Sequence, residues 1–305
     1  MACLGTLSAE VLIVSNYPEE IKEPGIVFKE RLTTGNMRIL YYHKGASVYP
    51  MDVHISLQNT SDIPVKVSVI SSQAGPDSDG LFAGHKTTFL FMEKLKNKSE
   101  VSLTILPQST LAVMTQKIKK GQVSSGLCTL RAQTSGNIQV VLAVVDPQNE
   151  AASLMNEVLM TKPYTYGYFN NPDFDTCALW PPEDPLYEWV IGDQPYLQDP
   201  LHHIELKGNY GAVYSCRVVL ANTTDHDQVI TLLASPVGGI ARGCVEVDGT
   251  LLETGFFEHK TDFKPQKMYE WRLPAGHVRH ALLKTMPQAG SFYPVHFVLR
   301  RDVAK

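Results

Sequence analysis

The stretch Asp52-Val-His-Ile-Ser-Leu57, followed by Gln58-Asn-Thr-Ser-Asp62, decides the fold class of this chain. In its first part an apolar side chain stands at every second position, which is typical of a strand with one buried face. In its second part short polar side chains can bond to nearby backbone, which is typical of a turn. Another alternating run follows at 65–69. The stretch therefore predicts two consecutive strands joined by a polar turn.

Alternation of this kind runs through most of the chain. It recurs at 101–105, 138–144, 214–220 and 295–299, and Asp248-Gly249 between two short apolar runs is a strong signal for a two-residue hairpin turn. Strands at intervals of about 8–12 residues, separated by turn residues, favour immunoglobulin-like β-sandwiches. We therefore predict an all-β protein.

The composition limits the class of protein further. A length of 305 residues suggests two domains, and a hydrophobic fraction of 44% is enough for buried cores. The formal net charge is −4, without the basic excess of nucleic-acid-binding proteins, so we expect no nucleic-acid partner. No apolar run approaches the roughly 18 residues of a membrane-spanning helix, so we expect no membrane span.

The two halves of the chain resemble each other in four motifs that occur in the same order. The pairs are Gly35-Asn36 with Gly208-Asn209, Leu57 to Asp62 with Leu220 to Asp225, Leu106-Pro107 with Leu273-Pro274, and Gly136 to Asp146 with Gly290 to Asp302. We therefore predict that residues 35–147 and 208–302 share one topology, as two tandem immunoglobulin-like sandwiches. The expected domains are 1–150 and 208–305, separated by a helix and a connector at 151–207.

Three stretches depart from the alternating pattern. Gly84 to Asn97 and Glu150 to Leu159 each predict a short helix. Tyr164 to Pro200 carries nine aromatic residues and six prolines, and from Pro163 to Leu206 there are eight acidic residues and no Lys or Arg. This composition predicts a long irregular connector, and such connections are often functional or packed across a domain junction.

The connector holds the candidate ligand-binding residues Trp180, Trp189, Tyr187 and Asp184. Aromatic faces beside carboxylates suit sugar rings, so these residues predict a carbohydrate site. The alternative is that the rings hold the connector against the sandwiches, because large aromatic side chains more often pack than bind. We expect that second role for Trp180 and Trp189, with both rings packed between the domains and away from solvent.

Asp77-Ser-Asp79-Gly80 resembles the beginning of a calcium loop, which makes Asp77 and Asp79 candidate calcium ligands. The twelfth position of such a loop would be Thr88 and not Glu, so the EF-hand motif is incomplete, and an ordinary turn is the alternative. The chain also lacks the nucleophile-elbow, metalloprotease, phosphate-loop and dinucleotide motifs. We therefore expect a non-enzymatic protein with no cofactor other than calcium. A hydrolase-type enzyme with a site between the domains is a further alternative.

The five cysteines are Cys3, Cys128, Cys177, Cys216 and Cys244, and no two of them form a C-x-x-C pair. This spacing excludes zinc-ribbon and thioredoxin-type sites. Cys216 and Cys244 lie in strand-like segments of one half, where a disulfide and two buried thiols are both consistent with the sequence. Met1 to Ala9 either ends a signal peptide or leads into the first strand.

Three groups of segments carry a resemblance to known proteins: Val11 to Pro18 with Pro24-Gly25-Ile26, Tyr41 to Gly45, and Ala74 to Asp77 with Gly84-His85. They resemble uncharacterised exported bacterial proteins, some of which occur beside stalk-like domains similar to the N-terminal regions of copper amine oxidases. The resemblance implies export and a β-rich protein outside the bacterial cell or on its surface. It implies no activity and no catalytic residues.

Together these observations predict a structural or adhesive protein whose partners are copies of itself or components of the cell surface. The candidate assembly residues are Val11, Leu12, Ile13 and Val14, in an apolar, β-prone segment near the N-terminus. Such a segment can be donated to the open sheet edge of a neighbouring copy. The alternative is that it pairs within its own domain.

Overall fold

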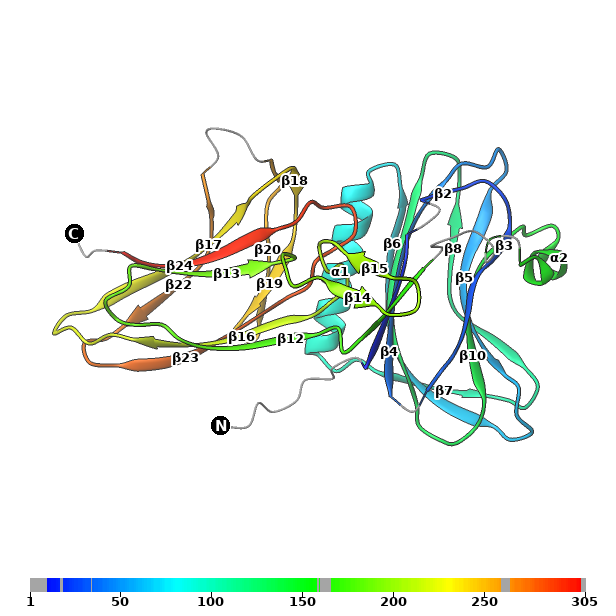
Figure 1. Cartoon of the computed structure of the whole chain (residues 1–305), viewed down its shortest axis with the longest axis horizontal. Coiled ribbons are helices and arrows are strands. Elements are labelled where there is room, and N and C mark those ends of the chain that lie inside the picture. The colour runs from blue at the N-terminus through cyan, green and yellow to red at the C-terminus, as the bar shows by residue number, and fades with distance from the viewer. Residues whose placement is uncertain are drawn as a thin grey trace. The chain divides into compact units, whose positions relative to one another are not determined.

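A computed structural model describes residues 10–16, 19–33, 35–157, 159, 166–258 and 264–302 (Figure 1). The described chain consists mainly of strands in packed sheets, with two helices. It divides into unit 1, residues 1–172 and 197–206, and unit 2, residues 173–196 and 207–305. The prediction of an all-β protein with two sandwich domains and short helices is confirmed.

Unit 1 is a sandwich of two sheets. Its strands are β1 Val11–Ser15, β2 Glu20–Ile21, β3 Gly25–Arg31, β4 Asn36–Gly45, β5 Met51–Asn59, β6 Val65–Asp77, β7 Val101–Ile105, β8 Thr110–Ile118, β9 Val123–Ala132, β10 Ile138–Val145 and β11 Gly167–Asn170. One sheet has the order β11-β1-β4-β9-β6-β7, with β2 beside β4, and the other has the order β3-β10-β5-β8. The alternating apolar side chains meet in one core, where Val53, Ile55 and Leu57 are fully buried.

The helix α1, Gly80–Lys96, packs on β6 and β9 of the first sheet (Figure 1). It begins earlier than the sequence predicts because the Asp79 carboxylate accepts a hydrogen bond from the N–H of Phe82 at 3.1 Å and caps the helix. Thr87 ties α1 to the sheet: its Oγ1 donates to the carbonyl of Ser125 and accepts from the N–H of Ala74, both at 3.0 Å. The short second helix, α2 Glu150–Met155, contacts β3 and β10.

Unit 2 is a second sandwich. Its main strands are β12 Phe174–Leu179, β13 Leu186–Ile191, β16 Tyr214–Ala221, β17 Gln228–Pro236, β19 Cys244–Val247, β20 Thr250–Glu253, β22 Gln266–Leu273, β23 Val278–Thr285 and β24 Val295–Asp302. They form sheets of order β12-β16-β23-β19-β20 and β13-β24-β17-β22, beside a small ladder of β18 Ile240–Ala241 and β21 Phe257–Glu258. Asp248 and Gly249 join β19 to β20 with φ angles of +48° and +84°, as a type I′ hairpin turn requires.

The two units share one strand order. The series β1-β4-β9-β6-β7 corresponds to β12-β16-β23-β19-β20, and the series β3-β10-β5-β8 corresponds to β13-β24-β17-β22. The strand directions also agree: β1·β4 and β12·β16 are parallel, and the other pairs in both series are antiparallel. The predicted common topology of residues 35–147 and 208–302 is confirmed. It also includes β1 and β3 in unit 1 and β12 and β13 in unit 2, which precede those ranges.

The polar turns that reveal the repeat make the same bonds in both units. Each asparagine side chain donates to at least two carbonyls: Asn59 to Ile63 and Ile105 at 2.8 and 3.1 Å, and Asn222 to His226, Leu273 and Pro274 at 2.8, 2.9 and 3.0 Å. However, the first turn joins β5 to β6 and the second joins β16 to β17, which are not corresponding strands. One turn chemistry therefore recurs at different corners of the common topology.

The segment 151–207 is not the irregular connector that its composition predicts. β11 and the hairpin of β14 Leu197–Asp199 and β15 Ile204–Leu206 belong to unit 1, whereas β12 and β13 belong to unit 2. The strands escaped detection because several are very short and because β12 lies at a sheet edge, where both faces of a strand are exposed and apolar alternation is lost.

The assembly segment Val11 to Val14 is also placed differently from the donated-strand hypothesis. β1 runs parallel to β4 on one side and antiparallel to β11 on the other, and its four apolar side chains are buried. Within-chain pairing is therefore the arrangement found for Val11, Leu12, Ile13 and Val14, and their donation to a neighbour stays a prediction. The physical reason for this pairing is that β11 closes the edge that the sequence left open.

Candidate association site on a sheet edge

β12 forms the edge of a sheet in unit 2, because the sheet order ends there and the strand pairs with β16 alone among the described strands. The N–H of Phe174 donates to the carbonyl of Val213 at 2.9 Å, so Phe174 directs its main-chain groups toward β16. Successive residues of a strand direct their N–H and C=O groups to opposite sides. Asp175, Cys177 and Leu179 therefore direct theirs away from β16.

The composition of β12 does little to block this edge. The strand contains no Lys, Arg or Pro, and its register with β16 continues without a bulge. Basic residues, proline and bulges are the usual devices that prevent an edge strand from pairing further. Asp175, Thr176 and Cys177 are exposed, and Leu179 keeps 76% of its surface exposed. The edge is therefore accessible to another strand.

The corresponding strand of unit 1 shows what such an edge accepts. The outer side of β1 is covered by β11, which pairs antiparallel in a register that runs from Val11 opposite Asn170 to Val14 opposite Gly167. Among the described residues of unit 2, no strand takes the place of β11. Within the described part of the chain, this edge of the common topology is therefore covered by a strand in unit 1 and by no strand in unit 2.

β12 is held firmly from its other side. The ring of Phe174 stacks on Tyr214 with a centroid distance of 4.5 Å. Just before the strand, Oδ1 of Asp173 accepts a hydrogen bond from the N–H of Val213 at 2.8 Å. The strand is therefore ordered before any partner arrives, which reduces the entropy that pairing would cost.

The predicted carbohydrate residues do not form an exposed platform. Trp180 is 1% exposed and Trp189 is 5% exposed. The guanidinium of Arg301 lies 4.0 Å from the centre of the Trp180 ring, and Trp189 packs against Phe297 at a centroid distance of 5.8 Å. The prediction that both rings are buried is confirmed, but these contacts lie inside unit 2 and not between the domains.

The other two candidate ligand residues also belong to unit 2. The hydroxyl of Tyr187 lies 3.8 Å from Sγ of Cys216, and burial raises the pKa of Tyr187 well above its ordinary value. Asp184 is exposed, and its carbonyl accepts a hydrogen bond from Nε of Arg301 at 3.3 Å. These residues pack and anchor the first strands of unit 2.

The candidate calcium ligands organise the turn before α1. Oδ1 of Asp77 accepts a hydrogen bond from the N–H of Asp79 at 2.9 Å, and the Asp79 carboxylate caps the helix. Within the described part of the chain, no three His, Cys, Asp or Glu side chains are grouped as a metal site would require. An Asx turn with a helix cap is therefore the role the geometry gives to Asp77 and Asp79.

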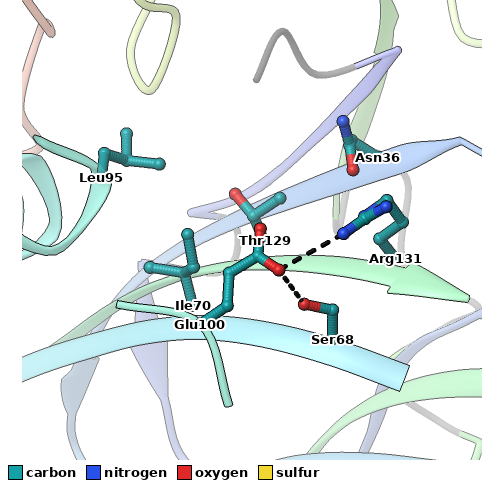
Figure 2. A pocket seen from close by; sticks show the side chains of 7 residues that line it. All are labelled: Asn36, Ser68, Ile70, Leu95, Glu100, Thr129 and Arg131. Atoms are coloured by element: carbon teal, nitrogen blue, oxygen red, sulfur yellow. Dashed lines mark hydrogen bonds and ion pairs between the residues drawn. The ribbon is translucent and has the colours of Figure 1, made fainter. Parts of the chain in front are cut away.

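A small polar pocket lies in unit 1 (Figure 2). Its lining residues are Asn36, Ser68, Ile70, Leu95, Glu100, Thr129 and Arg131. The Glu100 carboxylate accepts hydrogen bonds from Oγ of Ser68 at 2.5 Å and from Arg131 at 3.3 Å. The remaining space of about 10 Å³ accommodates about one water molecule, so this pocket is too small for an organic ligand.

A polar cluster on the β14–β15 hairpin is absent from the sequence predictions. The buried Asp199 carboxylate accepts hydrogen bonds from the N–H groups of Tyr168, Leu201 and His202, and Nδ1 of His202 lies 2.7 Å from its Oδ2. Burial alone would raise the pKa of Asp199, but the hydrogen bonds outweigh it and lower the pKa. Asp199-Pro-Leu-His202 is the signal that could have indicated this Asx turn. The bond to Tyr168 attaches the hairpin to β11.

Cys216 and Cys244 are buried thiols, and no disulfide joins them. β23 lies between their strands, β16 and β19. Strands on either side of a third are about 10 Å apart, whereas a disulfide needs Cα atoms within about 7 Å. Cys3 and the Met1 to Ala9 segment lie outside the described residues.

No family model matches the chain, and no curated protein matches it significantly. Among solved structures, the tandem CBM22-1–CBM22-2 domain of Xyn10C from Paenibacillus barcinonensis is 10% identical, with coverage of 93% of this chain and 92% of that one and a TM-score of 0.17. The secreted serine protease VesC from Vibrio cholerae is 8% identical, with coverage of 86% and 50% and a TM-score of 0.17. Likenesses at this TM-score carry no argument about the chain. None of the described helices is both long and apolar enough to cross a membrane.

Proposed function

We propose that this is a non-enzymatic structural or adhesive protein that associates through the open edge of β12. The observation that carries the proposal is the difference between β12 and its counterpart β1, whose outer edge is covered by an antiparallel strand. A strand added to β12 would extend a five-stranded sheet. Main-chain hydrogen bonds supply most of the affinity in this mode of recognition, and side-chain pockets supply the specificity.

The proposed location is outside the bacterial cell or on its surface. It rests on the resemblance of the Val11 to Pro18, Tyr41 to Gly45 and Ala74 to His85 segments to exported bacterial proteins. The proposed partners are accordingly copies of the chain or components of the cell surface. No cofactor is needed for strand pairing.

The rival functions have less support. The carbohydrate alternative depended on exposed tryptophan rings, and both rings are buried in unit 2. The enzyme alternative finds no observation in its favour, because the polar cluster of Asp199 and His202 is explained by the turn that it organises. Association through β12 uses an edge with which no described strand of unit 2 pairs.

The test is a pair of substitutions at one position. Asp175→Pro removes an N–H that is directed away from β16, so it blocks the open edge while the β12·β16 bonds remain. Asp175→Ala removes the same carboxylate but retains the N–H, and it is the matched control. Binding of labelled protein to cells of the source bacterium, and to immobilised wild-type protein, is measured by fluorescence.

We expect the wild-type protein and Asp175→Ala to bind at least one of these targets, and Asp175→Pro to bind it at least tenfold more weakly. Hydrogen exchange of the β16 amides confirms that the proline variant keeps its fold. If Asp175→Pro binds as well as Asp175→Ala, association through this edge is wrong.

A further inference from the structure

We propose that the end of unit 1 around the β4–β5 loop, residues 46–50, binds the surface of an anionic phospholipid bilayer. Two large side chains stand at the tip of this loop: Val48 is 76% exposed and Tyr49 is 74% exposed. The exposed residues Lys119 and Lys120 of the β8–β9 turn complete the surface. The inference goes beyond the proposed association through β12, because every residue in it belongs to unit 1.

Main-chain hydrogen bonds hold the beginning of the loop. The carbonyl of Gly45 accepts from the N–H of Gly121, and the N–H of Gly45 donates to the carbonyl of Gln122, both at 2.8 Å. The N–H of Ala46 donates to the carbonyl of Ile21, also at 2.8 Å. The loop therefore starts between the β8–β9 turn on one side and β2 on the other.

The tip of the loop lies at the same end of the sandwich as the two lysines. Val48 stands three positions after Gly45, and three residues span at most about 11 Å. On the far side of the loop, the ladder register places Met51 opposite Ile118, the last residue of β8. Both ends of the loop are thus tied to the strand and the turn that precede and carry the lysines.

The charge of this end is positive on the side of the β8–β9 turn. Among the described residues, Lys119 and Lys120 form no ion pair with a carboxylate. Near β2, by contrast, Nζ of Lys44 lies 3.1 Å from Oε1 of Glu20. Other charges of this end are offset as well: Lys117 lies opposite Asp52 in the ladder, and Lys22 stands among Glu19, Glu20 and Glu23. The turn therefore presents the positive charge that anionic headgroups attract.

The loop brings few unpaired backbone donors to its tip. The N–H of Tyr49 donates to Oγ of Ser47 at 3.2 Å, that of Ala46 is bonded to β2, and Pro50 has no N–H. Ser47 and Val48 carry the remaining N–H groups of the loop. This matters because an unpaired backbone group is costly in an apolar layer. A tyrosine ring also suits the boundary of a bilayer, where its body is in the apolar layer and its hydroxyl remains near water.

A bilayer fits this surface better than a folded protein does. A stable protein complex buries about 800 Å² on each partner, and its strongest contacts are side chains that fill pockets. The loop tip offers two exposed apolar side chains beside polar residues, which is little for such an interface. Lipids rearrange around a small apolar tip, and apolar burial and positive charge both strengthen the binding.

Cosedimentation of the full chain with lipid vesicles tests the proposal. One set of vesicles contains equal parts of phosphatidylglycerol and phosphatidylcholine, and the other contains phosphatidylcholine alone. The loop variant carries Val48→Ser with Tyr49→Ser, and the turn variant carries Lys119→Gln with Lys120→Gln. Urea unfolding shows whether both variants keep the stability of the wild type.

Two matched controls remove the same kinds of side chain elsewhere in unit 1. Val101→Ser with Leu106→Ser removes two exposed apolar side chains, and Lys66→Gln with Lys98→Gln removes two exposed lysines. A further variant, Tyr49→Trp, reports insertion through quenching of its fluorescence by lipids brominated in the acyl chains. The reporter is selective because the three tryptophans of the chain are buried.

We expect the wild type to bind the anionic vesicles at least tenfold more tightly than the neutral ones, and more weakly as the salt concentration rises. The turn variant should bind about 25-fold more weakly, from a factor of about five per lysine. The loop variant should bind at least tenfold more weakly, both controls should bind as the wild type does, and the Tyr49→Trp variant should be quenched.

The proposal is overturned if the wild type does not bind anionic vesicles, or if the loop and turn variants bind as their controls do. Absence of quenching in the Tyr49→Trp variant also overturns it, because the loop would then not enter the bilayer. If the loop variant loses binding to cells although no vesicle is bound, the partner of this surface is a protein and the lipid inference is wrong.

Discussion

Replacement of Asp248 by alanine should destabilise unit 2 more than any other single change in its turns. The Asp248 carboxylate accepts hydrogen bonds from the N–H of Leu282 at 2.9 Å, from Nε1 of Trp271 at 3.0 Å and from Arg279 at 2.7 Å. It thereby joins the β19–β20 turn to β23 and to the buried Trp271 of β22. We predict that Asp248→Ala lowers the free energy of unfolding by about 3–7 kcal/mol.

The magnitude is the sum of separate losses. Trp271 is 2% exposed, and an indole N–H left without an acceptor there costs about 1–3 kcal/mol. The N–H of Leu282 loses its bond at a cost of about 1 kcal/mol. The exposed Arg279 loses an ion pair worth about 0.2–1 kcal/mol. Position 248 has φ = +48°, and a left-handed conformation costs alanine about 1–2 kcal/mol more than it costs aspartate or asparagine.

Asp248→Asn is the matched control, because asparagine tolerates the left-handed conformation and keeps a side-chain acceptor. We expect it to cost about 1–2 kcal/mol, mainly through the weaker bonds of a neutral acceptor. Burial would raise the pKa of Asp248, but the bonds from Leu282, Trp271 and Arg279 outweigh it and lower the pKa from its ordinary value. A lowered pKa stabilises the folded state above the ordinary pKa, and this contribution is lost as the pH falls through the folded value.

Urea unfolding of the wild type and both variants measures these effects, with far-UV circular dichroism as the readout. The difference between wild type and Asp248→Asn should be constant from pH 7 to about pH 5 and should shrink below about pH 4. The reasoning is refuted if Asp248→Ala lowers the free energy of unfolding by less than about 1 kcal/mol, or by the same amount as Asp248→Asn. The Asp248 carboxylate would then not hold the turn through its three hydrogen bonds.

Three further predictions concern the turns and the core. Asn59→Ala and Asn222→Ala should each lower the free energy of unfolding by about 1–3 kcal/mol, because each removes the side-chain donor of one buried carbonyl, that of Ile105 or Leu273, and the double variant should be additive within about 0.5 kcal/mol in urea unfolding. Asp199→Asn should speed amide exchange in residues 197–206 at pH 7 by at least tenfold and leave β5 and β10 unchanged; equal exchange would contradict the anchoring role of Asp199. Gly126→Ala should cost about 1–3 kcal/mol, because the new Cβ would stand 2.3 Å from Cε1 of Tyr41, and wild-type stability in a thermal melt would count against that close contact.

The sequence predicts the half-buried strands well and the edge strands poorly. At 52–57 apolar side chains fill one face, which is fully buried, and polar side chains the other, where Asp52 and His54 are half-buried, so the alternation is visible without a structure. At 174–179 both faces are exposed, and the same backbone conformation leaves no periodic signal. The composition of 164–200 predicts a connector around Trp189, because the apolar Val190 on the other face of β13 hides the alternation of Trp189 and Ile191.

The candidate site depends on pairing, which the sequence does not encode locally. β1 has the apolar composition of an edge available for donation, but β11, far along the chain, covers it. β12 carries no distinctive sequence motif. It becomes a candidate because, among the described residues, no strand covers its outer side as β11 covers that of β1. The turn motifs do not identify which strands they join. An asparagine that bonds to at least two carbonyls suits more than one corner of a sandwich.

The β14–β15 hairpin has a consequence for the order of events during synthesis. Unit 1 is completed by residues 197–206, yet β12 and β13 of unit 2 precede that hairpin in the chain. A ribosome delivers the chain from its N-terminus, and domains generally fold as units as they emerge. Unit 1 therefore waits for its last hairpin while the first two strands of unit 2 are already outside the ribosome without their partners β16 and β24. During that interval the nascent chain exposes both edges of β12 and the apolar side chains of β13, Trp189 and Ile191 among them, which are surfaces that a chaperone could protect.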